Sequence, residues 1–196
     1  MKPAEIRSRH EGESSSVLVA AARDAQVDLL LRELRRTVSH IVHVYPVNGR
    51  IPAEHDVVLA DFSPALLDML PWVPGEATAA LIVLLPESGP SSLLKLRDCC
   101  PDAVLHRPFQ PAAVQTALML ARSQFQFIRR LRSRITRLDE NIRAIRDIER
   151  AKTIIMNSRQ LGEDEAYAFL RNQAMERRTT IASLASHLLD SHQLLR

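Results

Sequence analysis

The chain has 196 residues, of which 46% are hydrophobic and 25% are charged. These proportions are ordinary for a soluble globular protein, and the length suits one large domain or two small ones. No apolar run approaches the roughly 20 residues needed to cross a bilayer, so we expect no membrane contact. Residues 1–14 lack the apolar core of a signal peptide, and we expect a flexible tail on a cytoplasmic protein.

The net charge of +3 is unevenly distributed along the chain. Residues 124–196 hold 14 Lys and Arg against 9 Asp and Glu, whereas residues 1–123 hold 12 against 14. The excess is nearly all arginine, whose side chain suits phosphate groups and stacking on bases. A solvated helix surface has the same composition, so charge alone favours a nucleic-acid partner only weakly.

The residues that usually carry chemistry do not form a recognisable site. The only cysteines, Cys99 and Cys100, are adjacent, so they cannot join distant segments, and they are too few for a zinc site. We find no glycine-rich phosphate loop, no nucleophile elbow and no clustered metal ligands. The sequence therefore predicts no catalytic residue, no metal and no cofactor, and an enzyme is the least favoured interpretation.

The first two thirds of the chain alternate short apolar runs with helical stretches. The apolar runs cover residues 17–20, 41–44, 56–61, 81–85 and 103–105, and an amphipathic helix includes residues 29–34. Continuous apolar runs separated by helices are typical of a parallel sheet that is covered on both faces. The predicted fold class is α/β, with a doubly wound, five-stranded parallel sheet over residues 15–122.

A long helix follows, because no Gly or Pro interrupts residues 112–161. Apolar residues recur there with the heptad spacing of an a/d seam: Ile128, Leu131, Ile135, Leu138, Ile142 and Ile145. Ile at a with mostly Leu at d favours a parallel two-stranded coiled coil. The alternative is an amphipathic helix packed on its own domain, but the stretch is long for that role. We predict that residues 123–148 form a coiled-coil homodimerisation helix.

The end of the chain has the pattern of an all-α three-helix bundle over residues 149–196. The seam stops at Glu149, and Gly162 ends the long helix. The acidic residues after Gly162 suit the start of a second helix, whose amino end favours carboxylates. Thr179 or Thr180 can cap a third helix.

Three segments of this bundle, residues 148–156, 161–167 and 170–175, resemble the ANTAR domain of transcription antitermination regulators. Two departures are Gly162, where the family often has Ser or Thr, and Thr153, where Gly is usual. The resemblance implies a dimer that binds hairpins in leader RNA and favours an antiterminated transcript.

Basic and aromatic residues gather along the first two helices of the bundle and the turn after them: Lys152, Arg159, Tyr167, Arg171, Arg177 and Arg178. Lys and Arg neutralise phosphate, and an aromatic ring can stack on a base that a hairpin loop exposes. The alternatives are solvated cations and a tyrosine packed at the rim of the bundle. We predict that these six residues bind leader RNA.

The first domain resembles a response-regulator receiver that has lost its chemistry. Asp61, the last residue of the third run, stands at the phosphoacceptor position, and Arg107 replaces the lysine of the family's Lys-Pro-Phe element. Ala21 and Ala22 stand where an acidic pair would hold Mg²⁺, and Leu85 where Thr or Ser would contact the phosphoryl group. Because aspartyl phosphorylation needs a divalent cation, we expect a pseudo-receiver with a vestigial Asp61.

A pseudo-receiver, a coiled coil and an ANTAR end together resemble the regulators of bacterial aliphatic amidase operons. In that family a separate ligand-sensing protein sequesters the antiterminator, so the resemblance implies control by a regulatory protein rather than by phosphate. Two alternatives stay open. One is a DNA-binding response regulator, although the third helix has no basic residue on its exposed face before His187. The other is an adaptor whose terminal bundle binds only protein.

Overall fold

The computed structural model describes residues 16–47 and 49–194. The predicted flexible tail, residues 1–14, lies outside the described residues. The chain divides into two compact units, unit 1 up to Ile128 and unit 2 from Arg129. The predicted domain boundaries at residues 15, 123 and 149 stay predictions.

Unit 1 is built on a five-stranded parallel sheet with the order β2-β1-β3-β4-β5. The strands are β1 (Ser16–Ala20), β2 (His40–His43), β3 (Val57–Asp61), β4 (Ala80–Leu85) and β5 (Ala103–His106). The predicted doubly wound α/β fold is therefore confirmed, and each strand begins and ends within one residue of its predicted apolar run.

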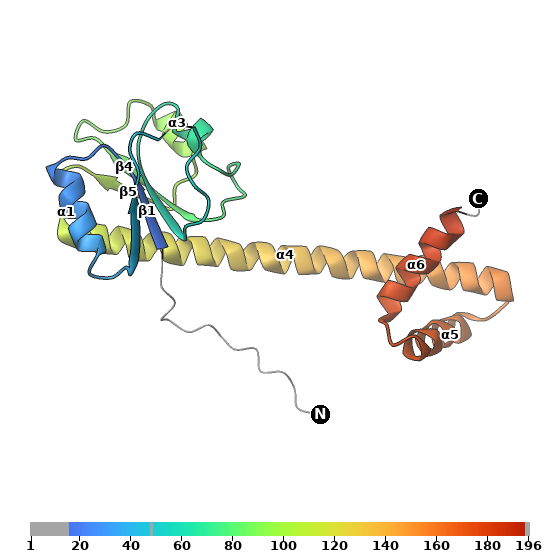
Figure 1. The fold of residues 1–196 in the computed structure, drawn as a ribbon. Coiled ribbons are helices and arrows are strands. Elements are labelled where there is room, and N and C mark those ends of the chain that lie inside the picture. Colours follow the sequence, from blue (N-terminus) through green and yellow to red (C-terminus); the bar gives the residue numbers. More distant parts are fainter. Residues whose placement is uncertain (1–15, 48, 195–196) are drawn as a thin grey trace. The chain divides into compact units, whose positions relative to one another are not determined.

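Helices cover both faces of this sheet (Figure 1). They are α1 (Ala25–Leu34), α2 (Leu66–Met69), α3 (Leu93–Asp98) and the beginning of α4 (Pro111–Arg159). Neighbouring strand residues point to opposite faces, so Val17 packs with α1 and α4 while Leu18 packs with the α2 side. Both faces are buried, which explains why the strands read as uninterrupted apolar runs.

The helix α4 contains the predicted coiled-coil seam. Its residues are exposed or half-buried in the single chain, with exposed fractions of 40% for Leu131, 58% for Ile135, 60% for Leu138, 47% for Ile142 and 61% for Ile145. Ile128 is half-buried. A regular row of open Ile and Leu side chains is unusual on the surface of a monomer and is typical of an interaction surface.

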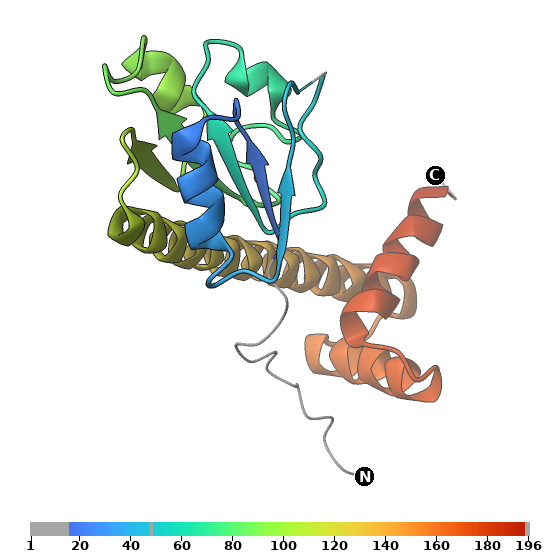
Figure 2. The same ribbon diagram turned by 60° about the vertical axis from the view of Figure 1, so that its left-hand side comes forward.

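Unit 2 consists of the end of α4 with α5 (Glu163–Glu176) and α6 (Ile181–Leu194), which Figure 2 shows from a second side. Its core is made of small and aliphatic residues: Ala151, Ile155, Ala166, Leu170, Ala174, Leu184 and Ala185. Four buried alanines leave room for the helix backbones to approach closely, and the predicted three-helix bundle is observed.

The predicted helix starts of unit 2 are also found. The N–H of Gly162 donates to Glu165 Oε2 at 3.0 Å, which fixes the start of α5 with the glutamate of a capping box. Of the two candidate caps for α6, Thr180 is the one used, because Ser183 N–H donates to its Oγ1 at 3.1 Å. No helix in residues 16–47 and 49–194 combines the length and the apolar composition of a membrane span.

Candidate functional site

One side of α5 presents an aromatic and basic surface. Tyr167, Arg171 and Met175 follow one another at intervals of four residues, so they share a side of the helix. All three are exposed, with 44% of Tyr167 and 66% of Met175 open to solvent. Ala166, Leu170 and Ala174 belong to the buried core. Because these three residues pack into the bundle, Tyr167, Arg171 and Met175 face the solvent.

The turn after α5 adds two arginines to its carboxyl end. Arg177 is the C-cap, and Arg178 takes a left-handed conformation with φ of 51°. Thr179 N–H then donates to Ala174 O at 2.9 Å, and Arg178 N–H donates to Met175 O at 3.1 Å. Glycine usually occupies the left-handed position of such a turn. Both arginine side chains are exposed, where the helix dipole favours cations.

Charge is therefore polarised along α5. The helix starts with three acidic residues, Glu163, Asp164 and Glu165. At its other end, the single acidic residue Glu176 is followed by Arg177 and Arg178. Glu163 is bonded to Lys152 and Glu165 to the N–H of Gly162, so two of the three early carboxylates have partners within the fold. The exposed arginines of this segment therefore lie in or just after the carboxyl half of α5.

Lys152 differs from the other predicted RNA-binding residues because it is buried, with only 8% exposed. Its Nζ donates to Glu163 Oε1 at 2.6 Å and lies 3.0 Å from Glu149 Oε1. The hydrogen bond to Glu163 raises the pKa of Lys152, and the same bond lowers the pKa of Glu163. These three residues, here named the Lys152 clasp, join α4 to the start of α5.

Arg159, the last residue of α4, is exposed but not isolated. Its guanidinium carbon lies 4.1 Å from the centre of the Phe169 ring, within the range of a cation–π contact. The contact depends on how the chain turns between α4 and α5, which no residue spacing reveals.

In unit 1, the position that corresponds to a phosphoacceptor is filled by internal contacts. The N–H of Ala22 donates to Asp61 Oδ2 at 3.0 Å, and Arg107 Nη2 donates to Asp61 Oδ1 at 3.2 Å. Arg107 Nη1 also donates to Asp24 Oδ2 at 2.5 Å. We call this group of Asp24, Asp61 and Arg107 the Arg107 cluster. It lies at the carboxyl ends of β1, β3 and β5, where ligands bind in this class of fold.

Further contacts fix the position of the Arg107 cluster. The Arg107 guanidinium lies 4.9 Å from the centre of the Phe109 ring, and Phe109 N–H donates to Gln26 Oε1 at 2.6 Å. Burial alone would raise the pKa of Asp24, but the hydrogen bond from Val27 N–H and the charge of Arg107 outweigh it and lower that pKa. Asp24 is also the N-cap of α1.

The residues present do not fit the Mg²⁺ of a phosphorylated receiver. Ala21 and Ala22 follow β1 where carboxylates would be needed, and the Arg107 guanidinium bridges Asp24 and Asp61. A fixed positive charge beside Asp61 repels a cation. Across the described residues, no group of three or more His, Cys, Asp or Glu side chains is arranged to hold a metal ion.

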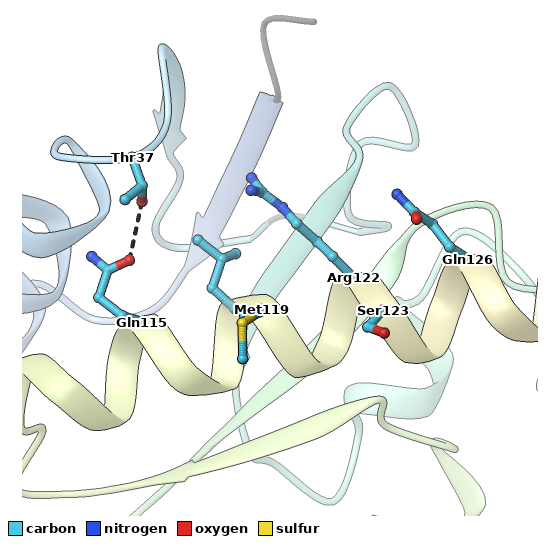
Figure 3. A pocket seen from close by; sticks show the side chains of 7 residues that line it. Thr37, Gln115, Met119, Arg122, Ser123 and Gln126 are labelled. Carbon is cyan, nitrogen blue, oxygen red and sulfur yellow. Dashed lines mark hydrogen bonds between the residues drawn. The ribbon is translucent and has the colours of Figure 1, made fainter. Parts of the chain in front are cut away.

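The described part of unit 1 has hollows beside α4 and along β5. The first, about 350 Å³, lies beside α4, and Figure 3 shows Thr37 bonded across it to Gln115 at 3.3 Å. Gln115 also donates to Glu33 O at 2.9 Å, so its side chain helps to pack α4 against the end of α1. The second, about 810 Å³, runs along β5 and the first turns of α4 and includes the exposed apolar side chains of Val104 and Leu120.

A first prediction concerns Asp61. Incubation of the protein with acetyl phosphate and Mg²⁺ should leave its intact mass unchanged, because Arg107 pairs with both Asp61 and the nearby Asp24, and its positive charge repels the cation. The Asp61→Asn variant is the control. A phosphoryl adduct on the wild type that is missing from this variant would contradict the prediction.

A second prediction concerns the Lys152 clasp. The lowered pKa of Glu163 means that its contribution to stability is present above its ordinary value of 4.5 and is lost as the pH falls through the folded value. The raised pKa of Lys152 means that its contribution is present below 10.5 and is lost as the pH rises through the folded value. In urea unfolding followed by circular dichroism, Lys152→Met should lower the midpoint near neutral pH and weaken its dependence on acid pH.

The control for the clasp is Lys95→Met, which removes an exposed lysine from unit 1. It should keep the wild-type pH dependence. If Lys152→Met also keeps that dependence, the clasp does not stabilise unit 2.

Comparison with known proteins adds independent findings. A family model described as AmiR, N-terminal, matches residues 15–122, and one described as ANTAR domain matches residues 136–189. The transcriptional regulatory protein PdtaR of Mycobacterium tuberculosis is 27% identical over 125 residues, 64% of this chain and 61% of that protein. The aliphatic amidase regulator of Pseudomonas aeruginosa is 27% identical over 115 residues, 59% of each chain. The matches thus span less than two thirds of either relative.

Solved structures of response regulators are also similar. Response regulator StyR has a TM-score of 0.45 at 16% identity and covers 91% of this chain and 99% of its own. Full-length FixJ from B. japonicum has a TM-score of 0.43 at 11% identity and covers 89% of this chain and 97% of its own. The AmiR N-terminal match alone spans more than half of the residues. The chain therefore belongs to the AmiR N-terminal family, and its carboxyl-terminal part matches the ANTAR domain, an arrangement that resembles the aliphatic amidase regulator.

Proposed function

We propose that this protein binds hairpins in leader RNA as a homodimer and promotes read-through of a terminator, under the control of a ligand-sensing protein rather than of phosphorylation. The observation that carries this proposal is the exposed surface of Tyr167, Arg171, Arg177 and Arg178 on a matched ANTAR domain. A regulator of this kind performs no catalysis and acts by binding alone.

The chemistry of this surface suits a single-stranded loop. RNA duplexes hide their base edges in a deep, narrow groove, whereas hairpin loops expose unstacked bases. Tyr167 offers a ring to such a base, and the arginines offer charge to the phosphates on either side. Arg171, Arg177 and Arg178 lie in or after the carboxyl half of α5, away from the acidic start of that helix.

The exposed seam on α4 supports the homodimer. Leu131, Ile135, Leu138, Ile142 and Ile145 bury little surface in one chain, and pairing two copies would cover them. In a parallel coiled coil, both ANTAR ends lie at the same end of the coil. Two linked binding sites then engage two hairpins of one transcript with a gain in avidity.

Unit 1 supports control through protein contact. Both oxygens of Asp61 have partners within the chain, so the position is poorly suited to accept a phosphoryl group. The apolar hollow along β5 and α4, with Val104 and Leu120 exposed, offers a surface that a protein could cover. A sensor that binds unit 1 more tightly in one ligand state would shift the fraction of free antiterminator.

The DNA-binding alternative is less well supported. A recognition helix reads the major groove with side chains near its amino end, and α6 begins with Ile181, Ala182 and Ser183. These residues are half-buried and carry no charge. They offer no side chain to a phosphate or to a guanine edge.

The RNA prediction is tested by titrating the full-length protein with the leader RNA of its own operon and with duplex DNA of equal sequence, at two salt concentrations. We expect salt-sensitive binding to the RNA alone, because phosphate contacts release counterions. Arg171→Ala should weaken that binding about tenfold, the loss of one charged hydrogen bond. Arg97→Ala, which removes an exposed arginine from α3, is the control and should bind as the wild type does.

Each outcome is informative. Equal or preferential binding to DNA would overturn the antitermination proposal and favour the DNA-binding regulator. Binding to neither nucleic acid, with a protein captured instead, would favour the adaptor.

The dimer prediction is tested by sedimentation equilibrium. Ile135→Asp combined with Leu138→Asp should produce a monomer, because two carboxylates in each chain would face one another across the seam. Ser133→Asp is the control, since position 133 lies on the side of the heptad opposite the seam and is exposed. A wild-type protein that sediments as a monomer at micromolar concentration would contradict the homodimer.

A further inference from the structure

The contact between Arg159 and Phe169 provides a flat cationic surface on unit 2. The guanidinium carbon lies 4.1 Å above the ring centre, so the ring contacts the group from one side. Arg159 is nevertheless an exposed residue. Arg159 thus contacts the ring on one side and still has surface open to solvent.

The position of Phe169 restricts the conformations of the Arg159 side chain. Its ring is half-buried and packs against the core cluster that contains Ala151, Leu170 and Ala174. An arginine that rests on a fixed ring has lost part of its rotamer freedom before any ligand arrives. Binding to a group organised in this way costs less entropy than ordering a free side chain.

The helix dipole alone does not account for an arginine here. A cation in the last turn of α4 interacts favourably with the carbonyl end of that helix, but a lysine would do so equally well. What arginine adds is a planar, delocalised group that can stack on both of its faces. One side of the Arg159 group already contacts Phe169.

The two aromatic rings of α5, Tyr167 and Phe169, lie on different sides of the helix. Phe169 follows Tyr167 by two residues, about 200° around the helix, so the two rings lie on different sides of α5. Between them, on the outward side, are Ala168 and Asn172, which are short and exposed. The outward side of α5 between the two rings also carries the exposed Arg171, so an RNA loop that lies across this side can contact both Arg171 and Arg159.

We propose that Arg159, supported by Phe169, is a stacking platform for one unpaired base of the RNA hairpin loop. The inference rests on the proposed RNA-binding function and adds a second contact point to it. Bases in RNA loops stack on guanidinium planes as well as on aromatic rings, so the sandwich of base, Arg159 and Phe169 is chemically ordinary. Stacking accepts any base, so the platform adds affinity and fixes the register of the loop without reading sequence.

The test is a double-mutant cycle between protein and RNA, with the full-length protein and a set of leader hairpins in which each loop base in turn is removed to leave an abasic site. For wild-type protein, one abasic position should weaken binding about tenfold, as expected for the loss of one stacked base. Arg159→Lys keeps the charge but not the plane. It should bind the intact hairpin about tenfold more weakly and lose nothing further at that abasic position.

Arg171→Lys is the matched control, because it changes another exposed arginine of the same surface in the same way. It should still lose about tenfold at the abasic position that Arg159→Lys ignores. Phe169→Leu is the second variant and should behave like Arg159→Lys, with circular dichroism to confirm that the helices are intact.

The inference is overturned if the wild type binds the hairpin and Arg159→Lys binds it equally well, or if every abasic hairpin binds as the intact one does. In both cases the proposed function stands, and Arg159 acts as a simple charge. A wild type that binds no hairpin at all overturns the proposed function, and this inference with it. The two failures are therefore distinguishable.

Discussion

The rest of the structure depends on one uninterrupted helix that supplies apolar side chains to successive partners. The first part of α4 packs Val114, Leu118 and Ala121 against the sheet of unit 1. The last part packs Ala151 and Ile155 into the core of unit 2. Between them lies the exposed seam of Ile and Leu. The same helix thus contributes to two cores, and its middle section keeps apolar surface that is exposed in the single chain.

Both units use some of their charges to stabilise the fold, and the charges that remain are those available for function. In unit 1 the guanidinium of Arg107 bridges two carboxylates, which turns a position suited to ion chemistry into a structural contact. In unit 2 the amine of Lys152 is similarly engaged. Arg171, Arg177 and Arg178 stay exposed at the far end of α5. The candidate site is therefore smaller than the basic composition of the region suggests.

The sequence predicted the elements well because they follow local rules. Buried parallel strands are continuous apolar runs, and the helix starts at Glu163 and Thr180 carry ordinary capping residues. It could not separate Lys152 from Arg171, because both are basic residues of adjacent helices. The difference depends on Glu163, which a turn brings back to α4. Arg107 and Asp24 are 83 residues apart in the chain, so their ion pair also needed the fold.

Backbone strain at Arg178 bears on the choice of RNA-binding residues. A left-handed conformation costs an ordinary residue about 1–2 kcal/mol, and glycine would avoid that cost. Gln160 and Cys100 have the same conformation, so strain alone does not indicate function. Arg178 differs from both because it follows a second exposed arginine at the carboxyl end of α5, beyond Arg171. Keeping a charged side chain there, at a cost in stability, is understandable if the charge contributes to binding an anion.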